Sequence, residues 1–482
     1  MSRETGSPLS RRKFAALAAG CGATANLIAQ DVPQNISNTP APEDRRRGPR
    51  PDIAPFSETL AFSRRLVEDK VRAFPMNAVR LTAGIFKDAE ESNRAVLHRL
   101  PVDRLVHNFR VNAGLASSAT PLGGWEAPDC ELRGHFTGHF LSACALLYAS
   151  TGDQEWRAYV TGGTSNGEGW RTEPRRLAAE LKLGPATTEC CCAYNMLKLT
   201  RHLYSWTADP RYFDYYERTL YNHRLGTIRK ESGATMYYLS IVPGAWKTFN
   251  TEYDSFWCCT GTGVEEYAKL NDSIYFHDED GVYVNLFIPS ELKWAEKGVT
   301  LRQQTAFPNE PSTTLTVSAD KPVHLAVRLR IPYWLTSGGS VKINGKPLEA
   351  IAGPGSYLTI ARKWNNGDRI EMDLPMSLHV EAMPDDASLQ ALLYGPLVLA
   401  GEQGSQGLTQ GMITGPEGPD LDHKPMNAPV VSAAGGDLLK LVKPASGRGP
   451  LAFELAGQDK PIVLAPLNSV FDQRYSIFWR VS

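Results

Sequence analysis

The sequence carries almost no excess charge and has no apolar run long enough to cross a membrane. Its 51 Lys and Arg residues and 52 Asp and Glu residues leave a formal net charge of −1 over 482 residues. This balance gives no reason to expect a nucleic-acid partner or an anionic membrane surface, and no apolar run reaches the roughly 20 residues of a spanning helix. Cysteine is too scarce for a disulfide framework, since five of the eight cysteines fall in two short clusters. A hydrophobic content of 42% is enough for buried cores, and the length predicts two or three domains.

The N-terminus has the pattern of an export signal. Arg11 and Arg12 directly precede a mild apolar run over residues 15–29, which contains Ala23-Thr24-Ala25 as a small-residue cleavage motif. The pattern is typical of a twin-arginine signal, so we expect residues 1–30 to direct a bacterial protein to the periplasm or the exterior. The alternative, a plain basic tail, is disfavoured by the apolar run. Residues 31–55, rich in Pro, Asn and Arg, are expected to form a disordered linker.

Residues 56–281 have the periodicity of helices. Apolar faces can be drawn over residues 58–73, 87–99 and 134–150. The clearest pair of helices follows Cys192, and Asp209-Pro210 caps and opens the second of them. By this periodicity we expect about seven helices in this region.

The pattern changes to strands near residue 282. Apolar and polar residues alternate over residues 324–331, and Asn344-Gly345 is a hairpin turn. Short strands with regular turn signals predict a β-sandwich over residues 282–400. The remainder, residues 401–482, is predicted to be a loop-rich C-terminal β region. The fold class is therefore α+β multidomain, with a helical domain followed by β domains.

Two clusters of adjacent cysteines stand out in the helical region. Cys258 and Cys259 precede a helical apolar pattern that continues to residue 275, and a thiol at a helix N-terminus is favoured as a thiolate. We expect Gly261 and Gly263 to let the backbone turn tightly into that helix. Free cysteines are also among the most buried residues, so the alternative is a pair of small hydrophobic side chains. Metal thiolates would need further ligands, and these are available in Thr188-Glu189-Cys190-Cys191-Cys192.

Several motifs, in a fixed order along the chain, resemble those of glycoside hydrolase family 127, the β-L-arabinofuranosidases. The likeness covers nearly the whole chain after the linker. The motifs are Arg133 to His139 (RGHFTGH), Gly162 to Glu168 (GGTSNGE), Thr188 to Leu199 (TECCCAYNMLKL), Phe256 to Gly263 (FWCCTGTG), Leu329 to Trp334 (LRIPYW) and Tyr394 to Gly401 (YGPLVLAG).

The resemblance implies a catalytic (α/α) toroid-type barrel followed by β-sandwich domains, and one zinc ion. Three thiolates and a carboxylate are a donor set that suits tetrahedral zinc. The alternative is a structural zinc without catalysis, because closed sites with four protein ligands are usually structural. The residues that match the family's zinc ligands are Glu189, Cys191, Cys258 and Cys259.

The resemblance also implies the catalytic pair of a retaining glycosidase. Cys258 matches the nucleophile and Glu168 the acid/base, although a carboxylate in a Gly-rich loop is by default simply exposed. His135 and His139 have the spacing of metal ligands, but substrate contact or core packing is the more common role. Tyr238 aligns loosely with a substrate-facing tyrosine.

One departure from the family concerns the helical domain. The family has a long helical segment between the Gly-His motif and the Gly-Gly motif, whereas here residues 148–157 run almost directly into residues 159–163. We therefore expect a catalytic barrel over residues 56–281 that is truncated near residues 151–158. Two interpretations follow: a zinc-thiolate retaining glycosidase acting on L-arabinofuranoside glycans, or a catalytically impaired or inactive carbohydrate-binding remnant. A glycosidase for another plant sugar is the runner-up enzyme.

Overall fold

The computed structural model describes residues 68–482 apart from residues 106, 113–115, 131–134, 137–159, 164–176, 182–183, 337, 350, 416–426, 434–435 and 458–459. The expected signal and linker, and the expected site residues Glu168 and His139, lie outside the described residues. None of the helices in the described part of the chain combines the length and apolarity that crossing a bilayer requires.

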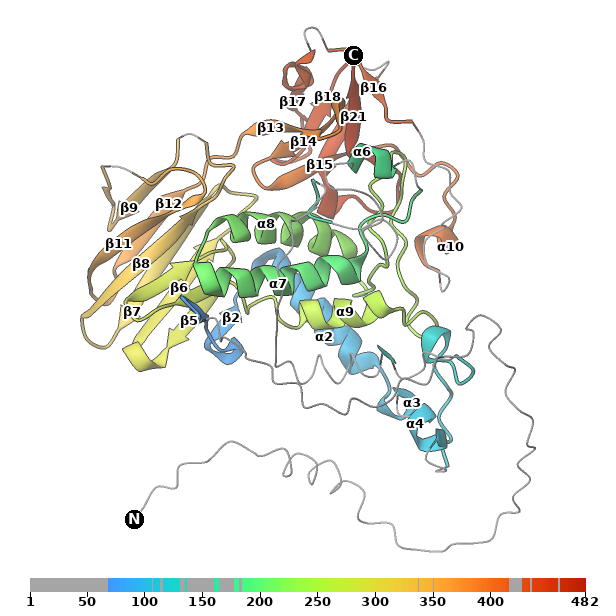
Figure 1. The fold of residues 1–482 in the computed structure, drawn as a ribbon, viewed down its shortest axis with the longest axis horizontal. Coiled ribbons are helices and arrows are strands. Elements are labelled where there is room, and N and C mark those ends of the chain that lie inside the picture. Colours follow the sequence, from blue (N-terminus) through green and yellow to red (C-terminus); the bar gives the residue numbers. More distant parts are fainter. Residues whose placement is uncertain are drawn as a thin grey trace, which may run out of the picture. The chain divides into compact units, whose positions relative to one another are not determined.

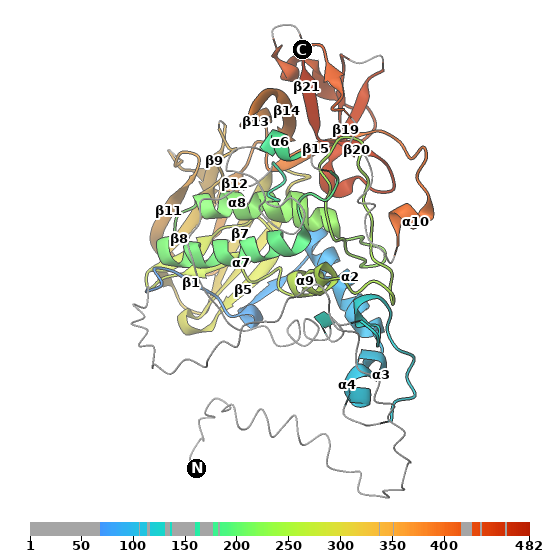
Figure 2. The same cartoon turned by 45° about the vertical axis from the view of Figure 1, so that its right-hand side comes forward.

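Helices occupy the N-terminal half of the described chain. The α-helices are α2 (Gly84–Arg99), α3 (Val102–Leu105), α4 (His107–Asn112), α6 (Leu177–Glu180), α7 (Cys190–Thr207), α8 (Arg211–Thr219), α9 (Cys258–Tyr267) and the later α10 (Gln410–Ile413). As predicted, α7 and α8 are separated at Asp209-Pro210, and Asp209 accepts a hydrogen bond from the Arg211 amide over 3.0 Å. The two helices lie side by side in both views (Figures 1 and 2).

Two sheets form the predicted sandwich, and they share one hydrophobic core. That core contains Val327 from one sheet and Val317 from the other, both fully buried. The first sheet runs in the order β1 (Arg72–Ala73), β3 (Tyr275–His277), β4 (Gly281–Val284), β8 (Val323–Ile331) and β11 (Ser356–Trp364). The second runs β10 (Lys346–Pro347), β9 (Ser340–Ile343), β12 (Arg369–Asp373), β7 (Ser312–Ala319), β6 (Val299–Thr305), β5 (Ser290–Trp294) and β2 (Val79–Leu81).

A third sheet of nine strands closes the chain. Its main path is β16 (Val430–Val431), β21 (Phe478–Val481), β14 (Asp386–Tyr394), β15 (Leu397–Glu402), β19 (Ile462–Pro466), β18 (Phe453–Leu455) and β17 (Val442–Pro444). Strand β13 (Leu378–Met383) pairs with β14, and β20 (Tyr475–Ser476) pairs with β15. Figure 1 shows these strands in orange and red.

Three expectations about boundaries are corrected. Residues 72–73, the end of the expected helix 58–73, form β1, because their backbone pairs with β3 of the sandwich. Helix α9 ends at Tyr267 rather than near residue 275, since Tyr275 begins β3. Strands β13, β14 and the start of β15 lie before residue 400, yet they belong to the third sheet rather than to the sandwich. Their partners β19 and β21 are supplied by the C-terminal segment.

Helix α8 is fastened to the sandwich by a buried ion pair network. Arg330 of β8 is fully buried and contacts Asp214 at 2.6 Å and Glu217 at 2.5 Å, both on α8. The Trp334 indole donates to the other Glu217 oxygen over 2.9 Å. The Leu329 to Trp334 motif therefore joins the β-sandwich to the helices.

The third sheet is fastened to the next segment of the same helical run. A single π-turn, η4 (Leu220–Arg224), continues α8. Its Asn222 donates to the Pro396 carbonyl and accepts from the Val398 amide, both over 2.7 Å. The turn between β14 and β15, in the Tyr394 to Gly401 motif, is thereby held against the helices.

Candidate active site

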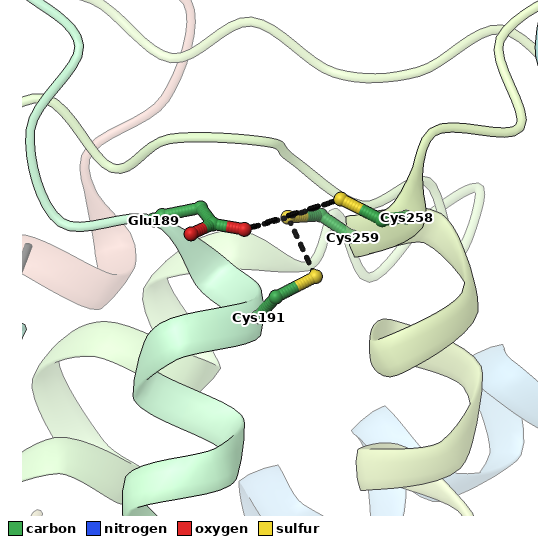
Figure 3. Close-up of side chains that lie close together, drawn as sticks. All are labelled: Glu189, Cys191, Cys258 and Cys259. Atoms are coloured by element: carbon green, nitrogen blue, oxygen red, sulfur yellow. Dashed lines mark hydrogen bonds between the residues drawn. The ribbon is translucent and has the colours of Figure 1, made fainter. Parts of the chain in front are cut away.

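Two helix N-termini bring a carboxylate and three thiols together. Glu189 is the N-cap residue of α7 and Cys191 lies in its first turn, while Cys258 and Cys259 are the first two residues of α9. Figure 3 shows the four side chains pointing toward one another from the ends of the two helices. Their ligand atoms all lie within 4.8 Å of one another, so the group could hold a metal ion. The positive ends of both helix dipoles favour negative charge here.

The distances within this group match a tetrahedral site of zinc size. The Cys259 sulfur lies 3.2 Å from the Cys191 sulfur and 3.8 Å from the Cys258 sulfur. Oε1 of Glu189 lies 3.7 Å from the Cys259 sulfur and 3.9 Å from the Cys258 sulfur. With metal–sulfur bonds of about 2.3 Å, the edge of a tetrahedron is about 3.8 Å. Donor chemistry and spacing both fit zinc.

The chain is strained immediately before each ligand pair. Thr188 has φ +52° and Phe256 has φ +46°, a region that non-glycine residues rarely adopt. The Thr188 carbonyl accepts hydrogen bonds from Nε2 of buried His223 (2.8 Å) and from the Leu239 amide (3.3 Å). Backbone strain of this kind persists only where surrounding contacts enforce it, which is common at functional sites.

Gly261 and Gly263 serve a different purpose from the tight turn that we expected. Both lie inside α9, and the unusual backbone angle falls on Phe256 instead. A Cβ atom on Gly263 would meet Cγ2 of Thr235 at 2.8 Å. At Gly263 the missing side chain therefore allows the loop at Thr235 to approach α9 closely.

The three thiols share their hydrogen atoms unequally. Hydrogen bonds from the thiols of Cys191 and Cys259 lower the pKa of the half-buried Cys258 thiol far below its ordinary value. The same hydrogen bond raises the pKa of Cys191, and burial raises that of Cys259. Negative charge in this cluster is thus held first on Cys258.

An aromatic cluster adjoins Cys258. The Tyr237 hydroxyl also hydrogen-bonds to the Cys258 sulfur and helps to lower its pKa, as does the nearby charge of exposed His135. The Tyr237 ring stacks on Tyr238 at 4.6 Å and meets Trp257 at 5.9 Å. Trp125 lies edge-on to both Tyr237 and His135, at 6.4 and 6.0 Å. Aromatic faces beside a nucleophile suit the apolar faces of a sugar.

The structure thus brings together Glu189, Cys191, Cys258 and Cys259, with His135 and Tyr238 close by. The sequence interpretation singled out Tyr238 and missed Tyr237, whose hydroxyl is the one that reaches Cys258. The backbone explains this choice. The Cys190 amide donates to the Tyr237 carbonyl over 2.9 Å and Glu189 bridges to Tyr238, so neighbouring side chains in this extended segment face different ways.

Comparison with protein-family models gives matches in three consecutive parts of the chain. The model described as the GH127 catalytic domain of beta-L-arabinofuranosidase matches residues 78–158 and 156–272. The model of the GH127 middle domain matches residues 281–376, and a domain of unknown function matches residues 379–481. The catalytic match comes in two pieces, as a partial barrel would give. Among curated proteins, no relative matches the chain.

Solved structures share the fold at low sequence identity. A glycoside hydrolase superposes with a TM-score of 0.52 at 19% identity, over 68% of this chain and 60% of that one. A GH127 beta-L-arabinofuranosidase from Geobacillus stearothermophilus T6 gives 0.51 at 19% identity, over 68% and 55%. Another GH127 beta-arabinofuranosidase gives 0.51 at 20% identity, over 68% and 54%. The chain therefore spans little more than half the length of these structures.

Proposed function

From the premise that this chain belongs to glycoside hydrolase family 127, we propose that it is a zinc-thiolate retaining glycosidase. The observation that carries the proposal is the convergence of Glu189, Cys191, Cys258 and Cys259 at two helix N-termini. Three soft sulfur donors and one carboxylate suit zinc better than the oxygen-preferring cations. Zinc bound there would keep the thiols ionised at neutral pH.

The proposed chemistry starts at Cys258. Its sulfur attacks the anomeric carbon while the bond from that carbon to the leaving oxygen breaks, and Glu168 gives the leaving oxygen a proton. Water, deprotonated by Glu168, then attacks the same carbon and releases Cys258, so that configuration is retained. The Tyr237 hydroxyl, bonded to the Cys258 sulfur, would orient the thiolate and stabilise it as it leaves. The role of Glu168 rests on the motif resemblance alone.

The proposed substrates are β-L-arabinofuranosides in plant-derived glycans. Two of the structural neighbours are described as GH127 arabinofuranosidases, which favours this sugar over others. The aromatic cluster of Trp125, His135 and Tyr237 supports recognition of a sugar ring next to Cys258. The runner-up is another glycosidase of the same mechanism that acts on a different sugar in plant polysaccharides.

The experiment that tests this function combines metal analysis with turnover. The chain, purified without a metal-binding tag, is expected to contain one zinc ion and to hydrolyse a chromogenic β-L-arabinofuranoside. Cys258→Ser should abolish hydrolysis, and Glu168→Gln should slow substrates with poor leaving groups most. The matched control is Cys130→Ser, a free thiol outside the cluster. Absence of zinc, or equal turnover by Cys258→Ser, would reject the proposal.

A second candidate is a non-catalytic, zinc-stabilised carbohydrate-binding protein. It is favoured by the two-piece catalytic match and by the short span relative to the structural neighbours. Under this alternative the purified chain contains zinc and binds arabinofuranosyl oligosaccharides, but does not cleave them. The same two measurements therefore distinguish the candidates.

We also propose export by the twin-arginine route. The basis is the sequence alone, with Arg11 and Arg12 ahead of an apolar run. This route carries folded proteins, so zinc would be loaded onto reduced thiols before export. Replacing both arginines by Lys should leave the precursor in the cytosol, whereas normal export of that variant would contradict the signal.

A further inference from the structure

Arg224 is a buried arginine without a carboxylate partner. It is the last residue of the π-turn η4 and is 1% exposed. No ion pair between described residues includes it, and its Nε has no hydrogen-bond partner. One Nη1 donates to the Cys190 carbonyl over 3.3 Å. A buried guanidinium of this kind is costly unless negative charge lies nearby.

The nearest negative charges available to Arg224 are thiolates. The Cys190 thiol is hydrogen-bonded both to Arg224 and to the Cys259 sulfur, so it connects the guanidinium to the ligand cluster. The charges that act most strongly on Arg224 are those of Tyr267, Cys190, Glu266 and Cys259. Tyr267 uses its own hydroxyl proton to bond the Arg224 carbonyl, which keeps it neutral. Glu266 shares the charge of Lys269.

A second buried arginine makes the contrast clear. Arg330 is as deeply buried as Arg224, but Asp214 and Glu217 neutralise it at 2.6 and 2.5 Å. Arg218, six residues before Arg224, is neutralised by Glu381 at 2.5 Å. Among these three arginines, Arg224 alone has the ligand cluster in place of a carboxylate partner.

We propose that Arg224 is the buried counter-charge of the metal site formed by Glu189, Cys191, Cys258 and Cys259. The inference rests on the proposed function, because it requires those ligands to bind zinc in their ionised form. Three thiolates and a carboxylate bring four negative charges to an ion of charge +2, leaving the site negative. In a low-dielectric interior, that excess is stabilised by a nearby cation. Arg224 is a positioning residue, acting through Cys190 and Cys259 rather than on the substrate.

The charge of residue 224, and not its hydrogen bond, is therefore expected to set zinc affinity. Arg224→Lys keeps a cation and should bind zinc within about threefold of the wild type. Arg224→Gln keeps a donor for the Cys190 carbonyl but removes the charge. A unit charge about 6 to 8 Å from the site, at an effective dielectric constant of about 20, alters affinity by about 30- to 100-fold. Arg224→Gln should thus weaken zinc binding by at least tenfold.

The test measures zinc affinity of the full chain by competition with a chromogenic zinc chelator. Arg218→Gln is the matched control, because its charge is already neutralised by Glu381, and it should leave zinc affinity unchanged. Thermal unfolding of each metal-free variant identifies any that do not fold. Arg224→Met serves as the second uncharged variant if Arg224→Gln does not fold.

The outcomes separate this inference from the proposed function. A wild-type chain that binds no zinc rejects the proposed function and, with it, the charge role. Wild-type binding together with an unchanged affinity in the folded uncharged variant overturns the charge role alone. Equal loss in Arg224→Lys and Arg224→Gln also overturns it, because that pattern would follow the shape of arginine rather than its charge. Loss in the uncharged variant with rescue by Lys supports it.

Discussion

The thiol of Cys192 donates a hydrogen bond to Oε2 of Glu189 over 2.9 Å. The other carboxylate oxygen, Oε1, faces the sulfurs of Cys258 and Cys259. Cys192 thus holds the oxygen that points away from the ligand cluster and fixes the plane of the carboxylate. Groups in this position orient metal ligands and tune their affinity.

Cys192→Ala should therefore weaken zinc binding without removing a ligand. We expect a loss of about tenfold, at the lower end of the range for groups behind a metal ligand, because a thiol is a weak donor. Chelator competition on the purified variant measures this, and Cys130→Ala controls for the loss of a free thiol elsewhere. Equal affinity in Cys192→Ala and the wild type would show that Glu189 is held by other contacts.

Gly263→Ala should destabilise the protein through a steric clash at the start of α9. The new methyl group would lie 2.8 Å from Cγ2 of Thr235, whose hydroxyl and amide are both bonded to Asn250. We expect a loss of about 1 to 3 kcal/mol in the free energy of unfolding, measured by urea denaturation. Gly353→Ala is the control, since nothing lies within 4 Å of a Cβ atom there, and it should stay within about 0.5 kcal/mol. Similar stabilities for both variants would refute the close-packing role of Gly263.

The sequence predicted most of the elements around the site, because their signals are local. The Asp209-Pro210 cap separates α7 from α8, and Asn344-Gly345, at φ +51° and +76°, forms the turn between β9 and β10. The composition of the metal cluster also came from local motifs, although only the family resemblance paired them. The spacing of apolar residues failed beyond Tyr267, since the residues that continue the helical period there begin a sandwich strand at Tyr275.

Contacts between distant segments could not be predicted from the sequence. Arg330 meets Glu217 across 113 positions, and Cys191 meets Cys259 across 68. Tyr237 and Tyr238 are chemically alike, and which of them faces Cys258 depends on how residues 237–239 pair with residues 188–190. A single chain carries no record of such pairing, which depends on the assembled fold.

Acid should destabilise the protein partly through His223. Burial, with the charge of Arg224, lowers the pKa of His223 from 6.5 to about 3. Below pH 6.5 the unfolded chain takes up a proton that the folded chain does not. Stability from this residue is therefore complete above pH 6.5 and is lost as the pH falls toward 3, by about 1.4 kcal/mol per pH unit.

His223→Gln should remove that part of the acid sensitivity, because Gln can donate to the Thr188 carbonyl without titrating. Urea denaturation across this pH range measures the slope for both proteins. His324→Gln, on an exposed position of β8, is the control and should follow the wild type. A variant slope equal to that of the wild type would mean that His223 binds its proton equally in both states.

The purified chain should assemble its zinc site but turn over an arabinofuranoside only weakly or undetectably. The four ligand residues and both proposed catalytic residues are present in the sequence, and the ligand geometry is supported by two helices that pack on each other. The structural neighbours are much longer, and the catalytic-domain match is broken at residues 156–158, next to the Gly-Gly motif that leads to Glu168. Catalysis needs the sugar in near-attack geometry, and a displacement of about 1 Å can cost about 100-fold in rate. A pocket with less wall also admits water, which weakens the stabilisation of charge at the anomeric carbon. Zinc stoichiometry measured alongside kcat/KM on a chromogenic β-L-arabinofuranoside tests both halves, with Cys258→Ser as the blank. Full zinc with rapid, Cys258-dependent turnover would show that the shortened helical domain still encloses its substrate.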